Sequence, residues 1–186
     1  CHLWLSRMEK DFGQTSCNCK KVVLFGPEST GKTTLAKKLA SYFNSDWVPE
    51  YARIYLQNKW DQTKEICSKE DLSIIAAGQM ALENQKARNN DSILFCDTDL
   101  LVTKIYSEVY FGGYCDPYLH HFAVNNHYDL YLLLDIDIPW APDDLRDKPD
   151  ERDQMLAKFK KALKSLHRPD VLIQGQGEVR FQAALH

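Results

Sequence analysis

Residues 21–39 read KVVLFGPESTGKTTLAKKL. An apolar run at 22–25 leads into a loop with the spacing Gly-x-x-x-x-Gly-Lys-Thr, and a helical pattern follows the loop. A strand before this loop and a helix after it are the context in which the pattern forms a phosphate-binding loop, or P-loop. The two glycines let the backbone fold around an anion, and the helix N-terminus presents partial positive charge to a β-phosphate. The segment therefore predicts binding of a nucleoside triphosphate.

The side chains of this loop have individual expected roles. Lys32 brings a full positive charge between the β- and γ-phosphates, and the hydroxyl of Thr33 can ligate Mg²⁺. No Asn-Lys-x-Asp guanine motif follows the fourth apolar strand, where Asp135-Ile-Asp-Ile stands, so the sequence favours ATP with Mg²⁺. The residues expected to bind ATP are Gly26, Glu28, Ser29, Thr30, Gly31, Lys32, Thr33 and Thr34.

Length and composition limit the class of protein. The chain has 186 residues, of which 44% are hydrophobic and 26% charged, which is typical of one globular domain. The net charge of −3 and the absence of a long Lys/Arg cluster in the sequence argue against a nucleic-acid partner. No segment approaches the roughly 18 apolar residues of a membrane span. We expect a soluble, cytoplasmic protein whose partner is a small molecule.

Two features precede the first strand. Residues 1–20 show no regular pattern, so we predict a poorly ordered N-terminal tail and a single domain at 21–186. Cys17 and Cys19 are too close together for a usual zinc knuckle. All six cysteines are therefore expected to be free thiols in a reducing cytoplasm.

The rest of the chain alternates between apolar runs and amphipathic patterns. This alternation predicts an α/β fold of the P-loop NTPase class, a doubly wound parallel five-stranded sheet with helices on both faces. Residues 58–68 lack apolar periodicity and are expected to form a mobile flap. The expected strands after the first are 47–48, 92–97, 129–135 and 171–173. The expected helices are 32–43, one from about 51, 69–88 with Ser68 as N-cap, 99–110, 117–126, 155–166 and 178–185.

Charged residues follow several of these strands, and the carboxyl ends of parallel strands meet at one edge of a sheet. Asp97 is expected to hold Mg²⁺; its alternative role is capping the next helix, which Thr98 and Asp99 can do in its place. Glu50 is expected to take the proton of an acceptor hydroxyl, the alternative being a surface ion pair with Arg53. In the loop 139–153, Arg146 is expected to close over the γ-phosphate, with Arg152 as a weaker candidate and surface salt bridges as the alternative.

Several segments together resemble one known family. GPESTGKTTLA, VPEYAR, the helix with IAAGQ, ILFCDTDLLVTKIY, YDLYLLLDIDIPW and the following D-x-L-R resemble the ribosylnicotinamide kinase domain of the NadR family, over about residues 21–183. The resemblance implies a P-loop kinase that transfers a phosphoryl group from ATP to the 5′-hydroxyl of nicotinamide riboside, giving nicotinamide mononucleotide. It implies catalytic roles for Lys32, Glu50, Asp97 and Arg146, and substrate contacts by Glu50, Tyr51, Arg53 and Asp99.

The sequence departs from this family in two ways. Family members often carry further domains before this one, whereas about twenty residues precede the first strand here, so we expect the kinase activity alone. In the family, two aromatic residues stack on the pyridine ring. The positions that resemble them in this chain hold Pro49 and Leu82, which are not aromatic. Tyr51, Tyr55, Trp60 and Tyr106 are the alternatives for a cationic ring. The remaining hypotheses are a kinase for another nucleoside and an ATP-binding regulatory module without an acceptor; Glu50 and the arginine-bearing loop favour a kinase.

Overall fold

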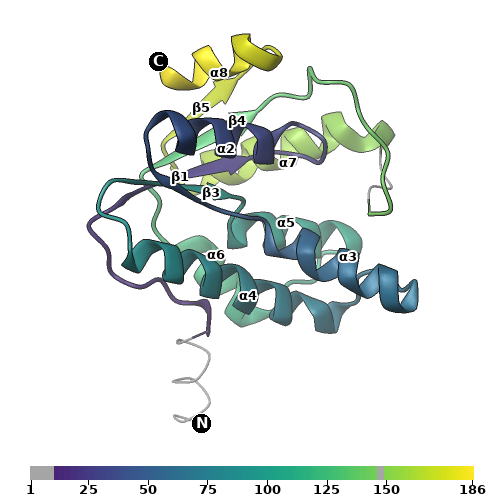
Figure 1. The fold of residues 1–186 in the computed structure, drawn as a ribbon. Helices are drawn as coiled ribbons and strands as arrows, with labels where there is room; N and C mark the ends of the chain where they lie inside the picture. The colour runs from purple at the N-terminus through teal and green to yellow at the C-terminus, as the bar shows by residue number, and fades with distance from the viewer. Residues whose placement is uncertain (1–10, 146–148) are drawn as a thin grey trace.

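The computed structural model describes residues 11–145 and 149–186. Five parallel strands form one sheet in the order β2-β3-β1-β4-β5 (Figure 1). The predicted doubly wound α/β fold is confirmed. The strands are β1 (Lys20–Phe25), β2 (Asp46–Val48), β3 (Ile93–Asp97), β4 (Leu130–Leu134) and β5 (Asp170–Ile173).

Helices cover both faces of the sheet because most of them carry an apolar stripe. On α2, the stripe of Leu35, Ala36 and Leu39 packs on one face, which α8 also covers. Residues of α4, α5 and α7 pack on the opposite face, and α6 lies outside α5. The helices are α2 (Lys32–Tyr42), α3 (Tyr51–Thr63), α4 (Lys69–Arg88), α5 (Leu100–Tyr110), α6 (Pro117–Asn125), α7 (Arg152–Ser165) and α8 (Gly177–Leu185), with a 3-10 turn, η1 (Pro149–Glu151).

The strand order places the predicted site residues next to one another. β1 lies in the middle of the sheet, between β3 and β4, and all three strands run in the same direction. The segments that follow them therefore emerge side by side at the carboxyl edge. These segments are the P-loop after β1, Asp97 at the end of β3 and the loop from Asp135 after β4.

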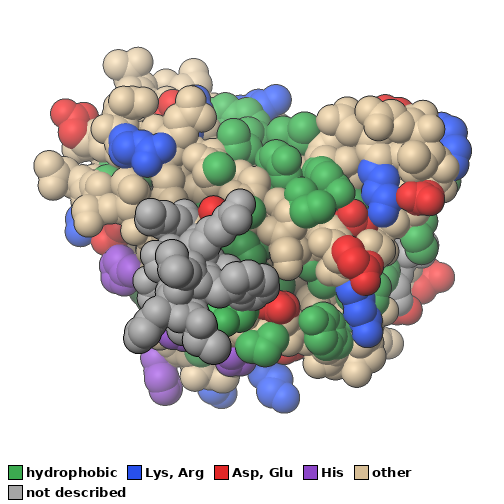
Figure 2. All heavy atoms as spheres, turned by 90° about the horizontal axis from the view of Figure 1, so that it is seen from below, with side chains coloured by type: hydrophobic (Ala, Val, Ile, Leu, Met, Phe, Trp, Pro, Cys, Tyr) green, Lys and Arg blue, Asp and Glu red, His purple; other side chains and the backbone are tan. Residues whose placement is uncertain are grey.

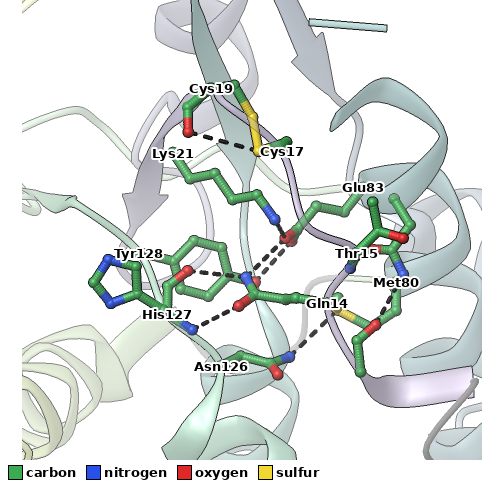
Figure 3. A network of polar contacts seen from close by, with 12 residues as sticks. Gln14, Thr15, Cys17, Cys19, Lys21, Met80, Glu83, Asn126, His127 and Tyr128 are labelled. Carbon is green, nitrogen blue, oxygen red and sulfur yellow. Dashed lines mark hydrogen bonds and ion pairs between the residues drawn. A yellow bond between two sulfur atoms is a disulfide. The ribbon is translucent and has the colours of Figure 1, made fainter. Parts of the chain in front are cut away.

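A buried polar network closes the opposite, amino edge of the sheet (Figure 3). Glu83 of α4 is 0% exposed, and its carboxylate accepts hydrogen bonds from Lys21 Nζ at 2.8 Å and Tyr128 Oη at 2.7 Å. Gln14 Nε2 donates to the same carboxylate at 3.0 Å. Phe12 is 2% exposed among α4, α5 and α6. The prediction of a poorly ordered tail is therefore wrong for residues 11–19, which this network and Phe12 hold against the domain.

The cysteines differ in part from the prediction. A disulfide joins Cys17 and Cys19, whose Cα atoms are 5.3 Å apart, within the range that a disulfide can bridge. The expectation of free thiols is wrong for this pair, because two cysteines separated by one residue can still reach the Cα separation that a disulfide needs. Cys67, Cys96 and Cys115 are free, as expected.

Residues 58–63 also differ from the prediction, because they continue helix α3. No residue of α3 is fully buried, and residues 58–63, NKWDQT, carry no apolar periodicity that could indicate a helix. Polar contacts attach α3 to α4 instead: Tyr55 Oη and Lys59 Nζ each donate to the carboxylate of Asp71 at 2.7 Å. Only residues 64–68 of the expected flap lie outside a helix, and their mobility stays a prediction.

Positive and negative side chains are mixed on the described part of the surface that carries α4 and α6 (Figure 2). In Figure 2, basic and acidic side chains are interspersed with hydrophobic ones on this face. Among the described residues, none of the helices has the length and apolar character needed to cross a membrane.

Candidate functional site

The P-loop backbone takes the shape that its glycines permit. Gly26 and Gly31 have φ values of 146° and 81°, which side-chain-bearing residues rarely adopt. A Cβ atom at Gly26 would lie 2.9 Å from the carbonyl oxygen of Leu134, so β4 also requires glycine there. Thr30 Oγ1 donates to the Pro27 carbonyl at 2.9 Å and closes the loop on itself. The result is a compact concave turn directly before α2.

Lys32 points its charge into this turn. Its Nζ donates to the carbonyl oxygens of Gly26 at 3.0 Å and Pro27 at 2.7 Å, and the residue is 9% exposed. Backbone carbonyls carry only partial charge, so a phosphate oxygen would be the stronger partner. The lysine is thus already positioned at the site where an anion would bind.

Asp97 and Thr33 lie together beside the P-loop. The Thr33 hydroxyl donates to Oδ2 of Asp97, while Oδ1 is buried and has no hydrogen-bond partner among the described residues. Burial raises the pKa of the Asp97 carboxyl, and the charge of Lys32 opposes this rise. A carboxylate and a hydroxyl are oxygen donors of the kind that Mg²⁺ takes, usually one or two from the protein with the rest from phosphates and water. The residues present therefore fit a magnesium ion.

Asp99 lies in the core, where it has the helix-capping role that the sequence allowed for it. It is 1% exposed, its Oδ1 accepts from the Val102 backbone at 3.2 Å, and its Oδ2 accepts from Tyr131 Oη at 2.7 Å. Burial raises the pKa of Asp99 to about 6. The expectation that Asp99 contacts the substrate conflicts with this geometry, because both oxygens are engaged in the core. Asp99 caps α5, which leaves Asp97 available for the metal.

A cavity of about 440 Å³ opens between the P-loop and the helices α3, α4 and α5. Its walls combine polar groups near the P-loop with apolar and aromatic side chains further away. Lys32 and Thr33 line this cavity together with the predicted substrate residues Glu50 and Arg53. Apolar lining residues include Leu56, Trp60, Leu72, Ile75, Val102 and Phe111.

The aromatic candidates separate into two groups. Trp60 and Tyr106 line the cavity. Tyr51 packs against α4 so closely that a Cβ atom at Gly78 would lie 2.1 Å from its ring. The hydroxyl of Tyr55 donates a hydrogen bond to Asp71. The predicted substrate contact by Tyr51 conflicts with this position, because the ring is directed at the helix.

Tyr106 interacts with both the P-loop and Glu50. The backbone of Glu28 in the P-loop forms a hydrogen bond to its hydroxyl. Burial raises the pKa of the Tyr106 hydroxyl, and the negative charges of Glu28 and Glu50 add to this rise. The phenol therefore stays neutral, and Tyr106 is close to both the P-loop and Glu50.

Sequence reasoning missed the residue that positions Glu50. Gln79 of α4 is 2% exposed; its Oε1 accepts from the Tyr51 backbone at 2.8 Å and its Nε2 donates to the Pro49 carbonyl at 3.2 Å. These bonds fix the backbone on both sides of Glu50, which precedes α3 as its N-cap. The signal was the Gly78-Gln79 pair inside a long helix, where glycine is unfavourable unless a neighbour needs the space.

The arginines connect the segment after β4 to the site. Arg53 forms an ion pair with Asp143, and Arg152 donates to the carbonyl oxygens of Ile138 at 2.9 Å and Ser29 at 3.1 Å. Residues 138–145 are thereby attached to both the P-loop and α3. Arg146 lies outside the described residues, so its predicted role over the γ-phosphate stays a prediction.

Comparison with known proteins supports the family predicted from the motifs. The trifunctional NAD biosynthesis/regulator protein NadR of Salmonella typhimurium is 30% identical over 127 residues, which is 68% of this chain and 31% of the relative. The crystal structure of NadR protein in complex with NR matches with a TM-score of 0.75 at 22% identity, over 90% of this chain and 49% of that chain. Deoxyadenosine kinase from M. mycoides matches with a TM-score of 0.62 at 16% identity, over 89% and 95% of the two chains.

These matches confirm the resemblance to NadR proteins, and the chain spans about a third of the length of the curated relative. The structural matches are below 25% identity and support the P-loop kinase fold. A family model described as AAA domain matches residues 21–180, which is most of the chain. The protein therefore belongs to the AAA-domain family.

Proposed function

We propose that the protein transfers the γ-phosphoryl group of ATP to the 5′-hydroxyl of nicotinamide riboside, which gives nicotinamide mononucleotide and ADP. One observation carries this proposal: the P-loop residues Lys32 and Thr33 and the carboxylate of Glu50 line the same cavity. A donor phosphate and an acceptor hydroxyl can therefore meet inside it. The relationship to NadR, of which one structure holds NR, suggests nicotinamide riboside as the acceptor.

The donor side of the cavity binds and polarises ATP. The P-loop amides and Lys32 hold the β- and γ-phosphates, and the Lys32 charge follows the γ-phosphoryl group as it moves. Thr33 and Asp97 would hold Mg²⁺. The ion would neutralise charge on the β- and γ-phosphates.

The acceptor side supplies orientation and a base. Glu50 accepts the proton of the 5′-hydroxyl while the oxygen bonds to the γ-phosphorus and the bond to the bridging β–γ oxygen breaks. Gln79 holds the backbone on either side of Glu50, so this segment does not need to be ordered at the moment of reaction. Arg53, at the mouth of the cavity, keeps the segment after β4 close through Asp143.

The composition of the wall supports a cationic aromatic acceptor. Trp60 and Tyr106 are aromatic residues of the cavity wall, and the negative charges of Glu28 and Glu50 act on Tyr106. A pyridinium ring gains from both, because ring faces and carboxylates each attract a cation. We assign ring stacking to Trp60 and Tyr106, and we propose the cytoplasm as the place of the reaction because ATP is supplied there.

A coupled assay of ADP release over a panel of ribosides tests the proposal. We expect the highest kcat/KM with nicotinamide riboside, and lower values with the uncharged nucleosides adenosine, cytidine and thymidine. A preference for one of those nucleosides would make the protein a kinase for a different acceptor. ATP binding without riboside-dependent ADP release would contradict kinase function and favour a regulatory ATP-binding module.

A further inference from the structure

Arg180, near the C-terminal end of the described chain, is almost completely buried against the P-loop. The residue is 3% exposed although it carries a charged side chain on α8. Its Nη1 donates to the carbonyl oxygen of Thr30, 150 residues away in sequence. Charged arginines are rarely buried to this extent unless each donor has a partner, so the partners of this side chain indicate what it does.

The guanidinium joins three segments that meet at the carboxyl edge of the sheet. Besides Thr30 of the P-loop, Nε donates to the Gly175 carbonyl at 2.7 Å and Nη2 donates to the Asp135 carbonyl at 3.0 Å. Nη2 also pairs with the carboxylate of Asp137. The arginine therefore connects the P-loop, the loop after β4 and the turn before α8, and its charge is balanced by one acid.

The bond to Thr30 has a consequence for the neighbouring amide. In a planar trans peptide the carbonyl oxygen and the N–H point in opposite directions. Holding the Thr30 carbonyl toward Arg180 therefore turns the N–H of Gly31 to the other side of the loop. Arg152 holds the preceding carbonyl, that of Ser29, in the same way at 3.1 Å, which orients the N–H of Thr30. Two successive amides are thus directed by arginines behind the loop.

We propose that Arg180 is a positioning residue that orients the P-loop amides for the β-phosphate, an inference that rests on the triphosphate site of the proposed function. Oriented amides bind an anion more tightly than flexible ones, because the loop does not have to be ordered on binding. Arg180 itself does not contact the nucleotide. It acts through the Thr30–Gly31 peptide.

The experiment compares Arg180→Lys with wild type by calorimetric titration with inorganic pyrophosphate, a probe that needs no nucleoside site. Lysine keeps the charge but cannot reach three carbonyls in the planar arrangement of a guanidinium. We expect pyrophosphate to bind at least about tenfold more weakly, the effect of losing one hydrogen bond of the charge-assisted kind. An affinity within about twofold of wild type, in a folded variant, would overturn the inference.

Arg168→Lys is the matched control. Arg168 Nη2 also donates to a backbone carbonyl, that of Val124 at 2.6 Å, but Val124 belongs to α6 and not to the P-loop. We expect this variant to lose stability without losing pyrophosphate affinity. Equal loss of affinity in both variants would mean that any weakened arginine contact has this effect, and would overturn the specific role of Arg180.

A second variant covers the case in which Arg180→Lys does not fold. In the native protein the Gly175 amide donates to Asp137 Oδ2 at 2.5 Å. Asp137→Asn keeps an acceptor for this amide but removes the negative charge that holds Arg180. We expect about threefold weaker pyrophosphate binding from this smaller change. Unchanged affinity there, with Arg180→Lys unfolded, would reduce Arg180 to a structural residue. Wild-type protein that does not bind pyrophosphate would contradict the proposed function itself.

Discussion

The two edges of the sheet both bury a lysine and a carboxylate, but they use them differently. At the amino edge, Lys21 and Glu83 form an ion pair at 2.8 Å (Figure 3). Tyr128 and Gln14 donate further hydrogen bonds to the Glu83 carboxylate. At the carboxyl edge, Lys32 donates only to backbone carbonyls, and one oxygen of Asp97 has no hydrogen-bond partner among the described residues.

This difference indicates that the buried charges of the amino edge stabilise the fold, whereas those of the carboxyl edge serve the reaction. Buried polar groups in proteins are nearly always hydrogen-bonded, so a partly satisfied group needs an explanation. The amino edge is satisfied by the protein alone and should contribute to stability. At the carboxyl edge, Lys32 and one oxygen of Asp97 are available to interact with a ligand, so these residues should contribute to turnover. Exchanging the two lysines in turn for neutral residues is the first way to test this distinction.

Lys21→Met should cause the largest loss of stability. It leaves the carboxylate of Glu83 buried without its counter-charge, and breaking a buried pair costs about 3–5 kcal/mol. Urea unfolding should show this decrease in the free energy of unfolding. The remaining folded protein should keep kcat within about twofold. A variant as stable as wild type would show that the network does not hold the amino edge together.

Lys32→Ala should show the opposite pattern. The variant loses the charge that stabilises the moving phosphoryl group, so kcat should fall about a thousandfold, or roughly 4 kcal/mol of transition-state stabilisation. The free energy of unfolding should stay within about 1 kcal/mol of wild type, since the hydrogen bonds lost go to two neutral carbonyl oxygens and Asp97, whose pKa is already raised by burial, can take up a proton when the Lys32 charge is gone. A kcat above a tenth of wild type would contradict the assigned role.

The same comparison explains which parts the sequence could predict. The positions of the P-loop, Asp97 and Glu50 at the carboxyl edge were predictable because each lies at or just after the end of an apolar strand. The roles of Asp97 and Glu50 there stay predictions. Docking of residues 11–19 was not, because Gln14 and Glu83 are 69 residues apart and the bond between them has no local signal. The helical continuation of α3 was missed for the related reason that its anchor, Asp71, lies on another helix.

Site roles that depend on burial could not be predicted from sequence either. Asp97 and Asp99 are two residues apart, and the sequence alone did not show that Asp99 is hydrogen-bonded by Tyr131 and Val102 in the core and so kept from the substrate. Arg180 looks like an ordinary charge on a terminal helix. Only the packing of α8 against the P-loop gives it a role, because its partner Thr30 is distant in sequence.

Glu50→Gln should reduce kcat about a hundredfold at saturating ATP, because the carboxamide keeps the volume but cannot take a proton. The affinity for ATP should be unchanged. Glu65→Gln is the matched control, because Glu65 also lines the cavity but has a largely exposed side chain. A raised acceptor KM at constant kcat would make Glu50 a binding residue, and no change above threefold in either parameter would remove it from the site.

Asp71→Asn should have the smallest effect, a decrease of about 1–2 kcal/mol in the free energy of unfolding, since it weakens charge-assisted bonds between α3 and α4. In the native protein the pKa of Asp71 is lowered to about 2 from its ordinary 3.8; bonds from Lys59, Ser68 and Tyr55 outweigh the opposing effect of burial. Because the folded pKa is the lower one, this stability is present above about pH 4 and is lost as the pH falls toward 2.

Urea unfolding of the variant and of wild type between pH 2 and pH 7 measures this effect. The difference between them should be constant at the upper end and shrink below about pH 4. Asp61→Asn, which changes an exposed carboxylate on α3 that accepts from Gln57 at 3.0 Å, should cause no comparable difference. A difference for Asp71→Asn that does not depend on pH would mean that the charge is not what attaches α3.

The most direct test of the central claim, that the carboxyl edge of this sheet is a phosphoryl-transfer site, is the ³¹P NMR spectrum of the products formed from ATP, Mg²⁺ and nicotinamide riboside. We predict ADP together with a phosphomonoester signal split by the two 5′-methylene protons, absent from a parallel reaction with Lys32→Ala. ADP with free inorganic phosphate alone, or an unchanged ATP spectrum, would contradict it.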